Sequence, residues 1–169
     1  EANRGNIALF WSFFNHITII LIQIRQTGKS FSTDGLVTLL LNILCRNTEI
    51  NLLTKDDTLR AANIKRLKDI EAELPSYLKQ RTKADINNTE ELTIKALNNR
   101  YRGHLPQKSP KMAYNVGRGL TSPIFQIDEG PFQPNIAISL PSALAAGTAA
   151  RDRAAMNGEP YGTILTTTA

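Results

Sequence analysis

Residues 17–30 of the sequence read ITIILIQIRQTGKS, and this stretch decides the fold. Its first part, residues 17–22, is apolar and rich in β-branched side chains, which predicts a buried β-strand. Its second part ends in Gly-Lys-Ser, and an apolar pattern with helical spacing follows it to about Leu44. A strand, a loop with this ending and a helix together form the arrangement that binds the phosphates of a nucleotide.

The loop at residues 25–30 contains the residue types that a triphosphate site needs. Backbone N–H groups at a helix N-terminus face the phosphates, and Gly28 leaves room for a close approach. The Lys29 ammonium can reach the β- and γ-phosphate oxygens, and the Ser30 hydroxyl can bind Mg²⁺. The standard P-loop spacing would place a glycine at position 23, where this chain has Gln23, so the loop departs from that pattern.

A second apolar strand, predicted at residues 124–127, leads into two adjacent carboxylates. Asp128 and Glu129 follow it directly, at the edge where ligands bind in open α/β sheets. Asp128 can hold Mg²⁺, usually through water, and Glu129 can orient and deprotonate an attacking water. We therefore expect both carboxylates to meet Lys29 and Ser30 at one edge of a parallel sheet.

The remaining pattern predicts strands that alternate with helices. Helices are expected at residues 7–14 and 29–44, from Asp56 or Asp57 to Pro75, and within 135–146, where Pro141 should interrupt the helix. Further strands are expected at 49–54, 92–96 and 163–166. Residues 98–111 are polar and contain prolines, so we expect a long loop there. In the helix after the phosphate loop, Leu36, Leu40, Ile43 and Leu44 are expected to face inward. The alternation predicts an α/β fold with a mostly parallel sheet and helices on both faces.

The composition fits one globular domain. A chain of 169 residues is long enough for a sizeable core, and 41% hydrophobic and 21% charged residues are ordinary values. Cys45 is the single cysteine, so an internal disulfide is excluded and an intracellular location is expected. The net charge of +5 permits contact with a polyanion. The apolar stretch at residues 8–24 contains polar residues and no cleavage site follows it, so we expect neither a membrane span nor secretion.

Taken together, these residues resemble the ATPase domain of the large terminases of tailed bacteriophages. Residues 25–30 are similar to the family's variant P-loop, in which arginine and glutamine replace small residues. The second motif corresponds to residues 116–121, which run into residues 123–132, and the third, a threonine-rich coupling motif, corresponds to residues 164–169. The three motifs occur in the order and at the spacing of the family, and they span nearly the whole chain.

The resemblance implies a role for each matching residue. The implied site consists of Glu129 and Arg25 as catalytic residues, Arg25, Gln26, Thr27, Gly28, Lys29 and Ser30 as the nucleotide-binding loop, Ser30 and Asp128 as Mg²⁺ ligands, and Thr166, Thr167 and Thr168 as the coupling motif. Arg25 would act in cis on the γ-phosphate, where positive charge stabilises the transition state. Arg118 is similar to a family arginine in a mobile loop, and its role is left open.

The resemblance also implies a fold type, a cofactor and partners. The fold would be a P-loop NTPase of the additional-strand, catalytic-glutamate type, with Mg²⁺ bound together with ATP. The implied partners are double-stranded DNA, the portal protein, the small terminase subunit and further copies of the chain in a homo-oligomeric ring. The implied place is the host cytoplasm, with transient binding at the procapsid portal, and no membrane is involved.

By the same resemblance, residues 1–169 form a single ATPase domain that stops within the third motif, without the family's nuclease domain. ATP hydrolysis is therefore expected from this chain, and DNA cleavage is not. Asn6 is the candidate nearest to the expected place of the family's adenine-contacting glutamine, so the contact with the base stays open.

Two alternatives belong to other classes of protein. A superfamily 2 helicase-like ATPase would share the fold, but its motif continues from Asp-Glu to a further Asp or His, whereas Asp128-Glu129 runs into Gly130-Pro131. A non-catalytic structural module could keep a P-loop fold, but the loss of Lys29 or Glu129 that would indicate it has not occurred.

Overall fold

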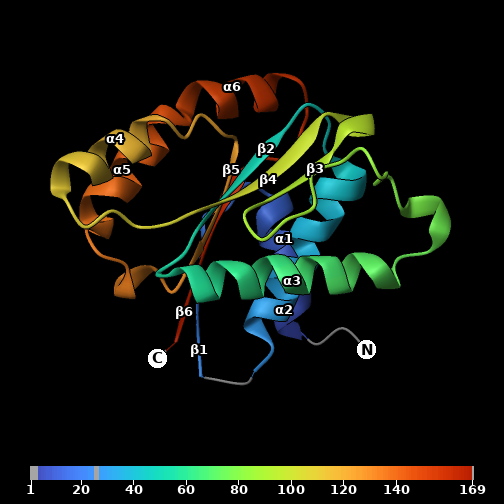
Figure 1. The fold of residues 1–169 in the computed structure, drawn as a ribbon, viewed down its shortest axis with the longest axis horizontal. Helices are drawn as coiled ribbons and strands as arrows, with labels where there is room; N and C mark the ends of the chain where they lie inside the picture. The colour runs from blue at the N-terminus through green and yellow to red at the C-terminus, as the bar shows by residue number, and fades with distance from the viewer. Residues whose placement is uncertain (1–3, 25–26, 169) are drawn as a thin grey trace.

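The computed structural model describes residues 4–24 and 27–168, apart from the side chains of residues 116 and 117 (Figure 1). The helices are α1 (Arg4–Phe14), α2 (Lys29–Leu39), α3 (Asp57–Glu73), α4 (Pro110–Arg118), α5 (Ile136–Ala146) and α6 (Thr148–Met156). The strands are β1 (Ile19–Gln23), β2 (Glu49–Leu53), β3 (Glu91–Ile94), β4 (Asn99–His104), β5 (Ile124–Asp128) and β6 (Gly162–Thr168). A π-helix, η1 (Leu40–Leu44), extends α2, and the 3₁₀ turns are η2 (Ser76–Leu78), η3 (Lys95–Leu97) and η4 (Gly130–Phe132).

The strands form one six-stranded sheet in the order β1-β6-β5-β2-β4-β3. All neighbouring strands are parallel except β3, which pairs antiparallel with β4 at one edge. β6 lies between the strand that precedes the phosphate loop and the strand that ends in Asp128, with Thr166 paired to Asp128. The predicted α/β fold with a mostly parallel sheet is confirmed, and β6 is the additional strand between the two motifs.

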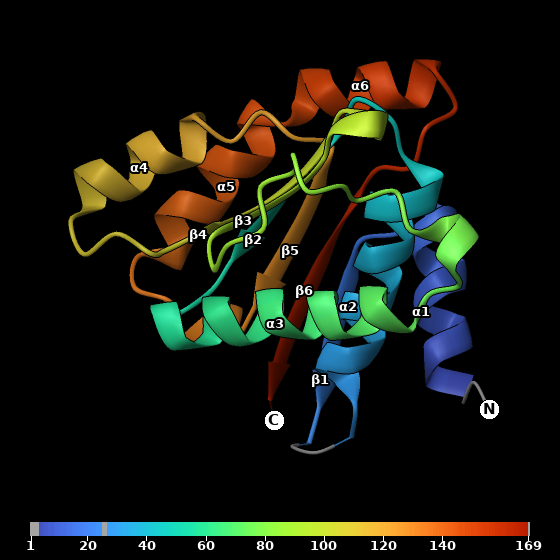
Figure 2. The same ribbon diagram turned by 45° about the vertical axis from the view of Figure 1, so that its right-hand side comes forward.

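Helices cover both faces of the sheet. Figures 1 and 2 show α1, α2 and α3 on one face and α4, α5 and α6 on the other. The larger core lies under the first group and includes Phe13, Leu36, Leu40, Ile50, Leu52, Ile64, Leu67, Tyr101, Ile124 and Ile164. The smaller core lies under the second group and includes Leu53, Leu120, Phe125, Ile127 and Ala143. Successive residues of β5 thus contribute to opposite cores, as the alternation of a strand requires.

The loop predicted at residues 98–111 is wrong, because β4 and the start of α4 lie there. β4 pairs with β2 on one side and β3 on the other, so it is an interior strand. Its buried positions are Asn99, Tyr101 and Gly103, and its exposed ones include Arg100. The alternation is therefore present, but it contains no aliphatic residue that the sequence pattern could have detected.

The inner face predicted for the helix after the phosphate loop is half right. Leu36 and Leu40 are fully buried, whereas Ile43 and Leu44 are 36% and 44% exposed. The helix ends in the wider π turn of η1, where the N–H of Cys45 bonds to the carbonyl of Leu40 at 3.0 Å. A π turn carries more residues per turn than an α-helix, so side chains beyond it rotate out of the expected stripe.

The predicted third helix is confirmed, and the structure decides between its two candidate caps. Asp56 has an extended backbone, and its carboxylate accepts a hydrogen bond from the N–H of Leu59 at 2.8 Å. Asp57 is the first helical residue instead. At the other end Leu74 has already left the helical region, as expected for the residue before Pro75.

Most other predicted elements are present. β1, β2, β5 and β6 occupy the predicted strands within a few residues, and α1 and α5 contain the predicted helices. The predicted interruption at Pro141 is wrong, because α5 continues through this residue. α6 was not predicted from sequence, and the reason is its composition: it is rich in alanine and buries only Ala154 completely, so it has no apolar stripe.

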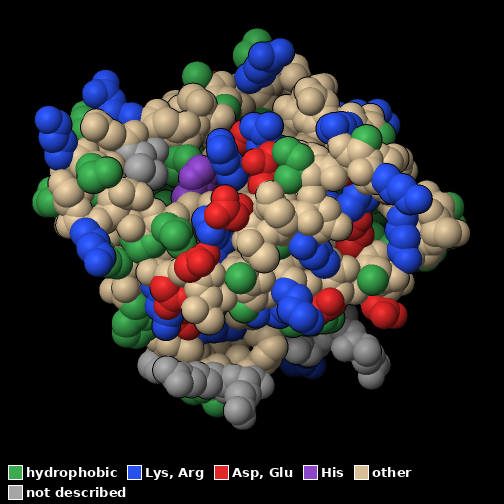
Figure 3. Space-filling view, viewed as in Figure 1, with side chains coloured by type: hydrophobic (Ala, Val, Ile, Leu, Met, Phe, Trp, Pro, Cys, Tyr) green, Lys and Arg blue, Asp and Glu red, His purple; other side chains and the backbone are tan. Residues whose placement is uncertain are grey.

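The surface in the view of Figure 3 mixes both signs of charge, with basic and acidic side chains interspersed. Ion pairs along α3 contribute to this mixture: Lys65 Nζ lies 2.9 Å from Asp69 Oδ2, and Arg60 Nη2 lies 2.9 Å from Glu90 Oε1. Within residues 4–24 and 27–168, no helix is both long enough and apolar enough to cross a membrane.

Candidate active site

The predicted phosphate loop lies between β1 and α2 in the sequence. Gly28 has a φ of 81° and a ψ of 9°, the left-handed conformation that favours glycine, and α2 begins at Lys29. On the strand side, the Thr27 hydroxyl donates to the carbonyl of Ile24 at 2.9 Å and to Oε1 of Gln23 at 3.0 Å. The loop therefore presents the N-terminus of α2, where the helix dipole attracts anions. Two residues predicted for this loop, Arg25 and Gln26, lie outside the described residues.

The acidic pair lies at the end of β5. Asp128 is the last strand residue and is almost fully buried. Glu129 follows with a φ of 54°, a left-handed backbone that turns the chain away from the strand direction. Its N–H donates to the carbonyl of Thr166 at 2.8 Å, which fixes this turn to the neighbouring strand β6.

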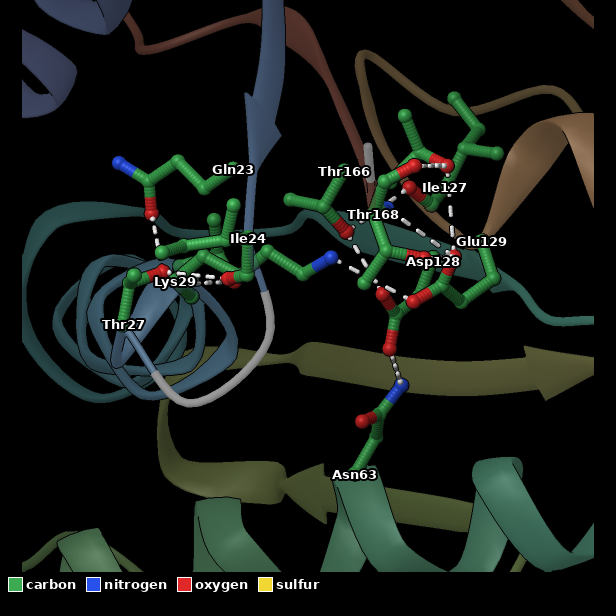
Figure 4. A network of polar contacts seen from close by, with 12 residues as sticks. Gln23, Ile24, Thr27, Lys29, Asn63, Ile127, Asp128, Glu129, Thr166 and Thr168 are labelled. Carbon is green, nitrogen blue, oxygen red and sulfur yellow. Dashed lines mark hydrogen bonds and ion pairs between the residues drawn. The ribbon is translucent and has the colours of Figure 1, made fainter.

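Lys29 and Glu129 connect the two motifs. The Lys29 ammonium lies 3.4 Å from Oε1 of Glu129, and the lysine is buried (Figure 4). An ion pair at this depth is less screened by solvent than a surface pair. The phosphate loop and the acidic pair, which are far apart in sequence, thus meet at the carboxyl edge of the parallel strands.

Neutral donors hold both carboxylate oxygens of Asp128. The Thr166 hydroxyl donates to Oδ1 at 2.7 Å, and the Asn63 side-chain amide donates to Oδ2 at 3.0 Å (Figure 4). A carboxylate oxygen has two acceptor sites, so each oxygen keeps one for another partner. Within residues 4–24 and 27–168, neutral donors orient this carboxylate and no cationic side chain pairs with it directly.

The carboxylate of Glu129 is surrounded by donors. Its Oε2 accepts hydrogen bonds from the N–H and the hydroxyl of Thr168 at 3.3 and 3.2 Å and from the hydroxyl of Thr167 at 3.3 Å. Burial raises the pKa of the Glu129 carboxyl, but the Thr168 N–H and the Lys29 charge lower it by more, so the pKa lies below its ordinary value. Glu129 is therefore ionised at neutral pH and can accept a proton.

All three threonines predicted for the coupling motif touch the acidic pair. Thr166 bonds Asp128, and Thr167 and Thr168 bond Glu129. They belong to β6, the strand between the phosphate-loop strand and the acidic strand. Any movement of the Glu129 carboxylate would therefore change contacts with the middle strand of the site.

The residues proposed as Mg²⁺ ligands suit that ion by their chemistry. Ser30 follows Lys29 in the first turn of α2 and offers a hydroxyl oxygen, and Asp128 offers carboxylate oxygens. In the part of the chain that the structure describes, no group of three or more His, Cys, Asp or Glu side chains is placed to hold a metal. Mg²⁺ that accompanies a nucleotide needs only one or two protein oxygens, because phosphates and water supply the rest.

Asn63 is a site residue that the sequence analysis missed. It lies on α3 and is fully buried, four residues before the buried Leu67 and eight before Glu71. The signal was a polar side chain on the inward stripe of an amphipathic helix, next to the buried Ile64. Its partner on β5 could not be inferred, because helical spacing does not say which strand a helix covers.

Arg118 is at the C-terminal end of α4 and is exposed. Its guanidinium lies 5.2 Å from the centre of the Tyr114 ring, a cation–π contact within the same helix. Among the described residues of the site, none contacts Arg118 in this structure. Its role therefore stays open.

Comparison with known proteins identifies the fold. The sequence matches no protein-family model, and no curated protein matches it. Among solved structures, the HK97 bacteriophage large terminase superposes with a TM-score of 0.65 at 14% sequence identity, covering 99% of this chain and 33% of that one. The large terminase of a thermophilic bacteriophage, solved in complex with ADP, gives a TM-score of 0.64 at 15% identity, covering 99% of this chain and 38% of that one.

A third similar structure is limited to the ATPase domain. A mutant of the Thermus phage P74-26 large terminase ATPase domain has a TM-score of 0.62 at 13% identity, covering 100% of this chain and 66% of that one. The chain thus spans about a third to two thirds of the length of these proteins. Residues 4–24 and 27–168 have the fold of the ATPase domain of phage large terminases.

Proposed function

We propose that this chain is the ATP-hydrolysing motor domain of a phage large terminase, which drives double-stranded DNA into a procapsid. The observation that carries the proposal is the contact of Lys29 with Glu129 at 3.4 Å, beside the threonines of β6. It joins a phosphate loop, a carboxylate base and a third motif at one sheet edge. The likeness to terminase ATPase domains, one of them named as such, supports the same assignment.

In the proposed reaction, Lys29 and the N-terminus of α2 bind the β- and γ-phosphates. The Lys29 ammonium would then leave its ion pair with Glu129 and bind a phosphate oxygen instead. Because the Lys29 charge lowers the pKa of Glu129, its departure would make the carboxylate a stronger base. Glu129 would accept a hydrogen bond from the attacking water and take up its proton. Bound through Ser30 and Asp128, Mg²⁺ would neutralise charge on the phosphate oxygens.

Thr167 and Thr168 give this reaction a route to movement. Both hydroxyls hold Glu129, and both residues lie at the end of β6. Protonation of Glu129 during hydrolysis weakens these charge-assisted hydrogen bonds. We propose that the end of β6 then changes position, and that this step couples hydrolysis to DNA movement in a homo-oligomeric ring.

The remaining partners follow from the same proposal. The ring would act in the host cytoplasm, transiently bound to the portal protein of the procapsid and to the small terminase subunit, with Mg²⁺ as cofactor. Arg25, outside the described residues, would act in cis on the γ-phosphate. The superfamily 2 helicase-like ATPase is less well supported, because Gly130 and Pro131 follow the acidic pair where that class has a further Asp or His.

The experiment compares wild type, Glu129→Gln and Lys29→Ala in the full-length protein. Glu129→Gln keeps the shape of the side chain and removes the base, so ATP turnover should fall by about 10²–10⁴-fold while nucleotide affinity changes little. Lys29→Ala should weaken nucleotide binding as well. Turnover of Glu129→Gln within a few-fold of wild type would remove Glu129 from the catalytic role. A wild type that binds nucleotide with Mg²⁺ but never hydrolyses it would favour the non-catalytic structural module.

The role proposed for Arg25 has a separate test. If Arg25 stabilises charge on the γ-phosphate, Arg25→Ala should slow hydrolysis much more than it weakens ATP binding, because that charge grows in the transition state. Arg25→Lys should restore little, since a point charge cannot reproduce the planar guanidinium. A loss confined to ATP affinity in both variants would assign Arg25 to the structure of the loop.

A further inference from the structure

A buried carboxylate lies on α2, five residues after Lys29. Asp34 is fully buried within α2. Its Oδ2 accepts a hydrogen bond from Nε of Arg66 at 2.8 Å, and its Oδ1 accepts one from Nε2 of Gln126 at 2.7 Å. Arg66 belongs to α3, and Gln126 belongs to β5, two residues before Asp128. Asp34 therefore ties α2 both to a neighbouring helix and to the acidic strand.

Arg66 extends this connection to the active site. Its Nη2 donates to Oδ1 of Asn63, one turn earlier on α3. Nδ2 of Asn63 in turn donates to Oδ2 of Asp128 at 3.0 Å, and Figure 4 shows Asn63 reaching from α3 to that carboxylate. A continuous series of hydrogen bonds thus runs from the phosphate-loop helix to the carboxylate that we assign to Mg²⁺.

Tyr101 of β4 contacts Gln126, the second partner of Asp34. Its hydroxyl donates to Oε1 of Gln126 at 2.9 Å, so Nε2 of that amide faces Asp34. We refer to these five side chains as the polar network: Asp34, Asn63, Arg66, Tyr101 and Gln126. Four of them are fully buried or nearly so, and Arg66 is partly exposed.

Arg66 and Asp128 hold opposite ends of the Asn63 amide. An amide can present either its oxygen or its NH₂ group to a neighbour. Because a guanidinium only donates hydrogen bonds, Arg66 must take the amide oxygen, and the NH₂ group must then face Asp128. The opposite orientation would place an oxygen against the carboxylate and an NH₂ group against the guanidinium. The acceptor Asp128 and the donor Arg66 thus require the same orientation of the amide, and Arg66 holds its oxygen end in place.

The Arg66 guanidinium pairs with Asp34 and reaches Asp128 only through Asn63, an arrangement suited to metal binding at Asp128. A guanidinium placed directly on Asp128 would neutralise the carboxylate and oppose the approach of a cation. Asn63 instead orients the carboxylate as a neutral donor, and the Arg66 charge is opposed by Asp34 at 2.8 Å. Partners that orient a ligand without competing with the metal are typical of the residues behind metal ligands.

We propose that Asn63 and Arg66 are positioning residues for the Mg²⁺-dependent step: Asn63 holds the Asp128 carboxylate in its metal-binding orientation, and Arg66 fixes Asn63. This inference rests on the proposed ATPase function. Because Arg66 also binds Asp34 on α2, the phosphate-binding helix and the metal-binding carboxylate are positioned relative to each other by the same contact. A purely structural role for the network would predict lower stability alone, with no change in metal dependence.

The experiment measures how strongly Mg²⁺ tightens nucleotide binding in the full-length protein. The affinity for a fluorescent ATP analogue is determined with Mg²⁺ and with EDTA, for wild type and Asn63→Ala, together with the thermal midpoint of each protein. Asn63→Ala should reduce the Mg²⁺-dependent gain in affinity by about 10-fold, the size typical for loss of such a partner, while its affinity in EDTA stays within about twofold. The Mg²⁺ concentration for half-maximal hydrolysis should rise correspondingly.

Asn99→Ala is the matched control. Asn99 is also a buried asparagine, and its amide donates to the carbonyls of Leu41 and Cys45 at 2.8 and 2.7 Å, but it begins β4, at the opposite end from the site. Its loss should lower the thermal midpoint and leave the Mg²⁺-dependent gain unchanged. Arg66→Lys should fall between wild type and Asn63→Ala, because one ammonium cannot reproduce the two-sided contact of the guanidinium with Asp34 and Asn63.

The outcomes separate this inference from the proposed function. A normal Mg²⁺-dependent gain in Asn63→Ala, alongside a wild type that binds and hydrolyses MgATP, overturns the positioning role and leaves the ATPase assignment intact. An equal loss of the gain in Asn99→Ala also overturns it, because the effect would then follow stability. A wild type whose nucleotide affinity does not respond to Mg²⁺ overturns the ATPase assignment and this inference together.

Discussion

Strand β5 buries different kinds of side chain on the two faces of the sheet. Under α4–α6, Phe125 and Ile127 of β5 lie in an apolar cluster with Leu53, Leu120 and Ala143. Under α1–α3 the polar network lies within the larger core, and it includes Gln126 of the same strand. Successive side chains of β5 therefore point to opposite faces of the sheet. The polar network on the α1–α3 face contacts Asp128 through Asn63.

The difference shows how the molecule separates stability from the orientation of its site. Apolar burial is favourable and non-directional, so a core such as the one under α4–α6 stabilises the fold without fixing a particular atom. Buried polar groups cost free energy unless each finds a partner, but their hydrogen bonds are directional. We expect substitutions on the apolar face to change stability alone, and substitutions in the network to change pH dependence or metal dependence as well.

Phe125→Ala is expected to have the largest effect on stability. Phe125 is fully buried, and truncation of a buried aromatic ring costs about 3–5 kcal/mol through lost burial and the cavity that remains. Urea unfolding of the variant measures this loss, and the Mg²⁺-dependent gain in nucleotide affinity should stay that of wild type. Phe132→Ala is the control, since that ring is 60% exposed and its loss should cost about 0.5 kcal/mol or less. A comparable loss in both variants would contradict the assignment of Phe125 to a stabilising core.

Asp34→Asn tests the polar face through pH. Burial raises the pKa of the Asp34 carboxyl from 3.8 to about 6, although Arg66 and Gln126 act to lower it. Because the folded-state pKa is the higher one, the contribution of this group to stability is complete below the unfolded pKa and is lost as the pH rises through about 6. One pKa unit is worth about 1.4 kcal/mol, so wild type should gain on the order of 3 kcal/mol over the variant as the pH falls from about 7 to about 3.

Urea unfolding of both proteins across this pH range gives the difference directly. His104 has the opposite effect, because burial, with the charges of Arg102 and Arg60, lowers its pKa from 6.5 to about 4. Its contribution is present above the unfolded pKa and is lost as the pH falls through about 4. His104 occurs in both proteins, so its effect cancels in the difference. A stability difference that does not change with pH would mean that Asp34 titrates as it does in the unfolded chain.

Tyr101→Phe removes a single atom from the network and should cost about 1–3 kcal/mol. Tyr101 is fully buried, and without its hydroxyl the Oε1 of Gln126 would lose its donor at 2.9 Å. The cavity is minimal, so the cost measures the unsatisfied polar atom. Tyr77→Phe is the matched control, because Tyr77 is 78% exposed and its loss should have little effect. Equal unfolding free energies for wild type and Tyr101→Phe would mean that this contact adds nothing to the stability of the polar face.

The sequence revealed the two motif strands for a reason that does not apply to the network. β1 and β5 are mostly apolar runs, and each leads to residues with recognisable chemistry: Gly28-Lys29-Ser30 after β1 and Asp128-Glu129 at the end of β5. Both the strands and the candidate site residues at their ends could therefore be predicted. β4 presents Asn99, Tyr101 and Gly103 to the interior. Because the strand has no aliphatic side chain, its sequence has the composition of a loop.

The contacts of the network were hidden for a different reason. Asp34, Arg66 and Gln126 lie on three elements, and their pairing depends on which helix covers which strand. The local spacing of residues reports the face of one element and not its neighbour. The order β1-β6-β5-β2 is what brings these three residues together, and that order could be inferred only from the family resemblance.

The smallest effect is expected at the start of α3, the helix that carries Asn63 and Arg66. Asp56→Ala removes the cap that accepts from the N–H of Leu59 at 2.8 Å, and the loss of such a cap costs about 1 kcal/mol. Asp57→Ala is the matched control: the neighbouring carboxylate is 70% exposed and pairs with Arg60 at 2.7 Å, a contact worth about 0.5 kcal/mol or less. Urea unfolding measures both losses.

This pair of variants also tests whether the polar face is positioned locally. If α3 is held in place by the contact of Arg66 with Asp34, a frayed first turn should leave Asn63 where it is, because the cap affects mainly the first turn of the helix. The Mg²⁺-dependent gain in nucleotide affinity should then be the same in wild type, Asp56→Ala and Asp57→Ala. A reduced gain in Asp56→Ala alone would mean that the N-terminal turn of α3 sets the orientation of Asp128. The contact of Arg66 with Asp34 would then not be what holds α3 in place.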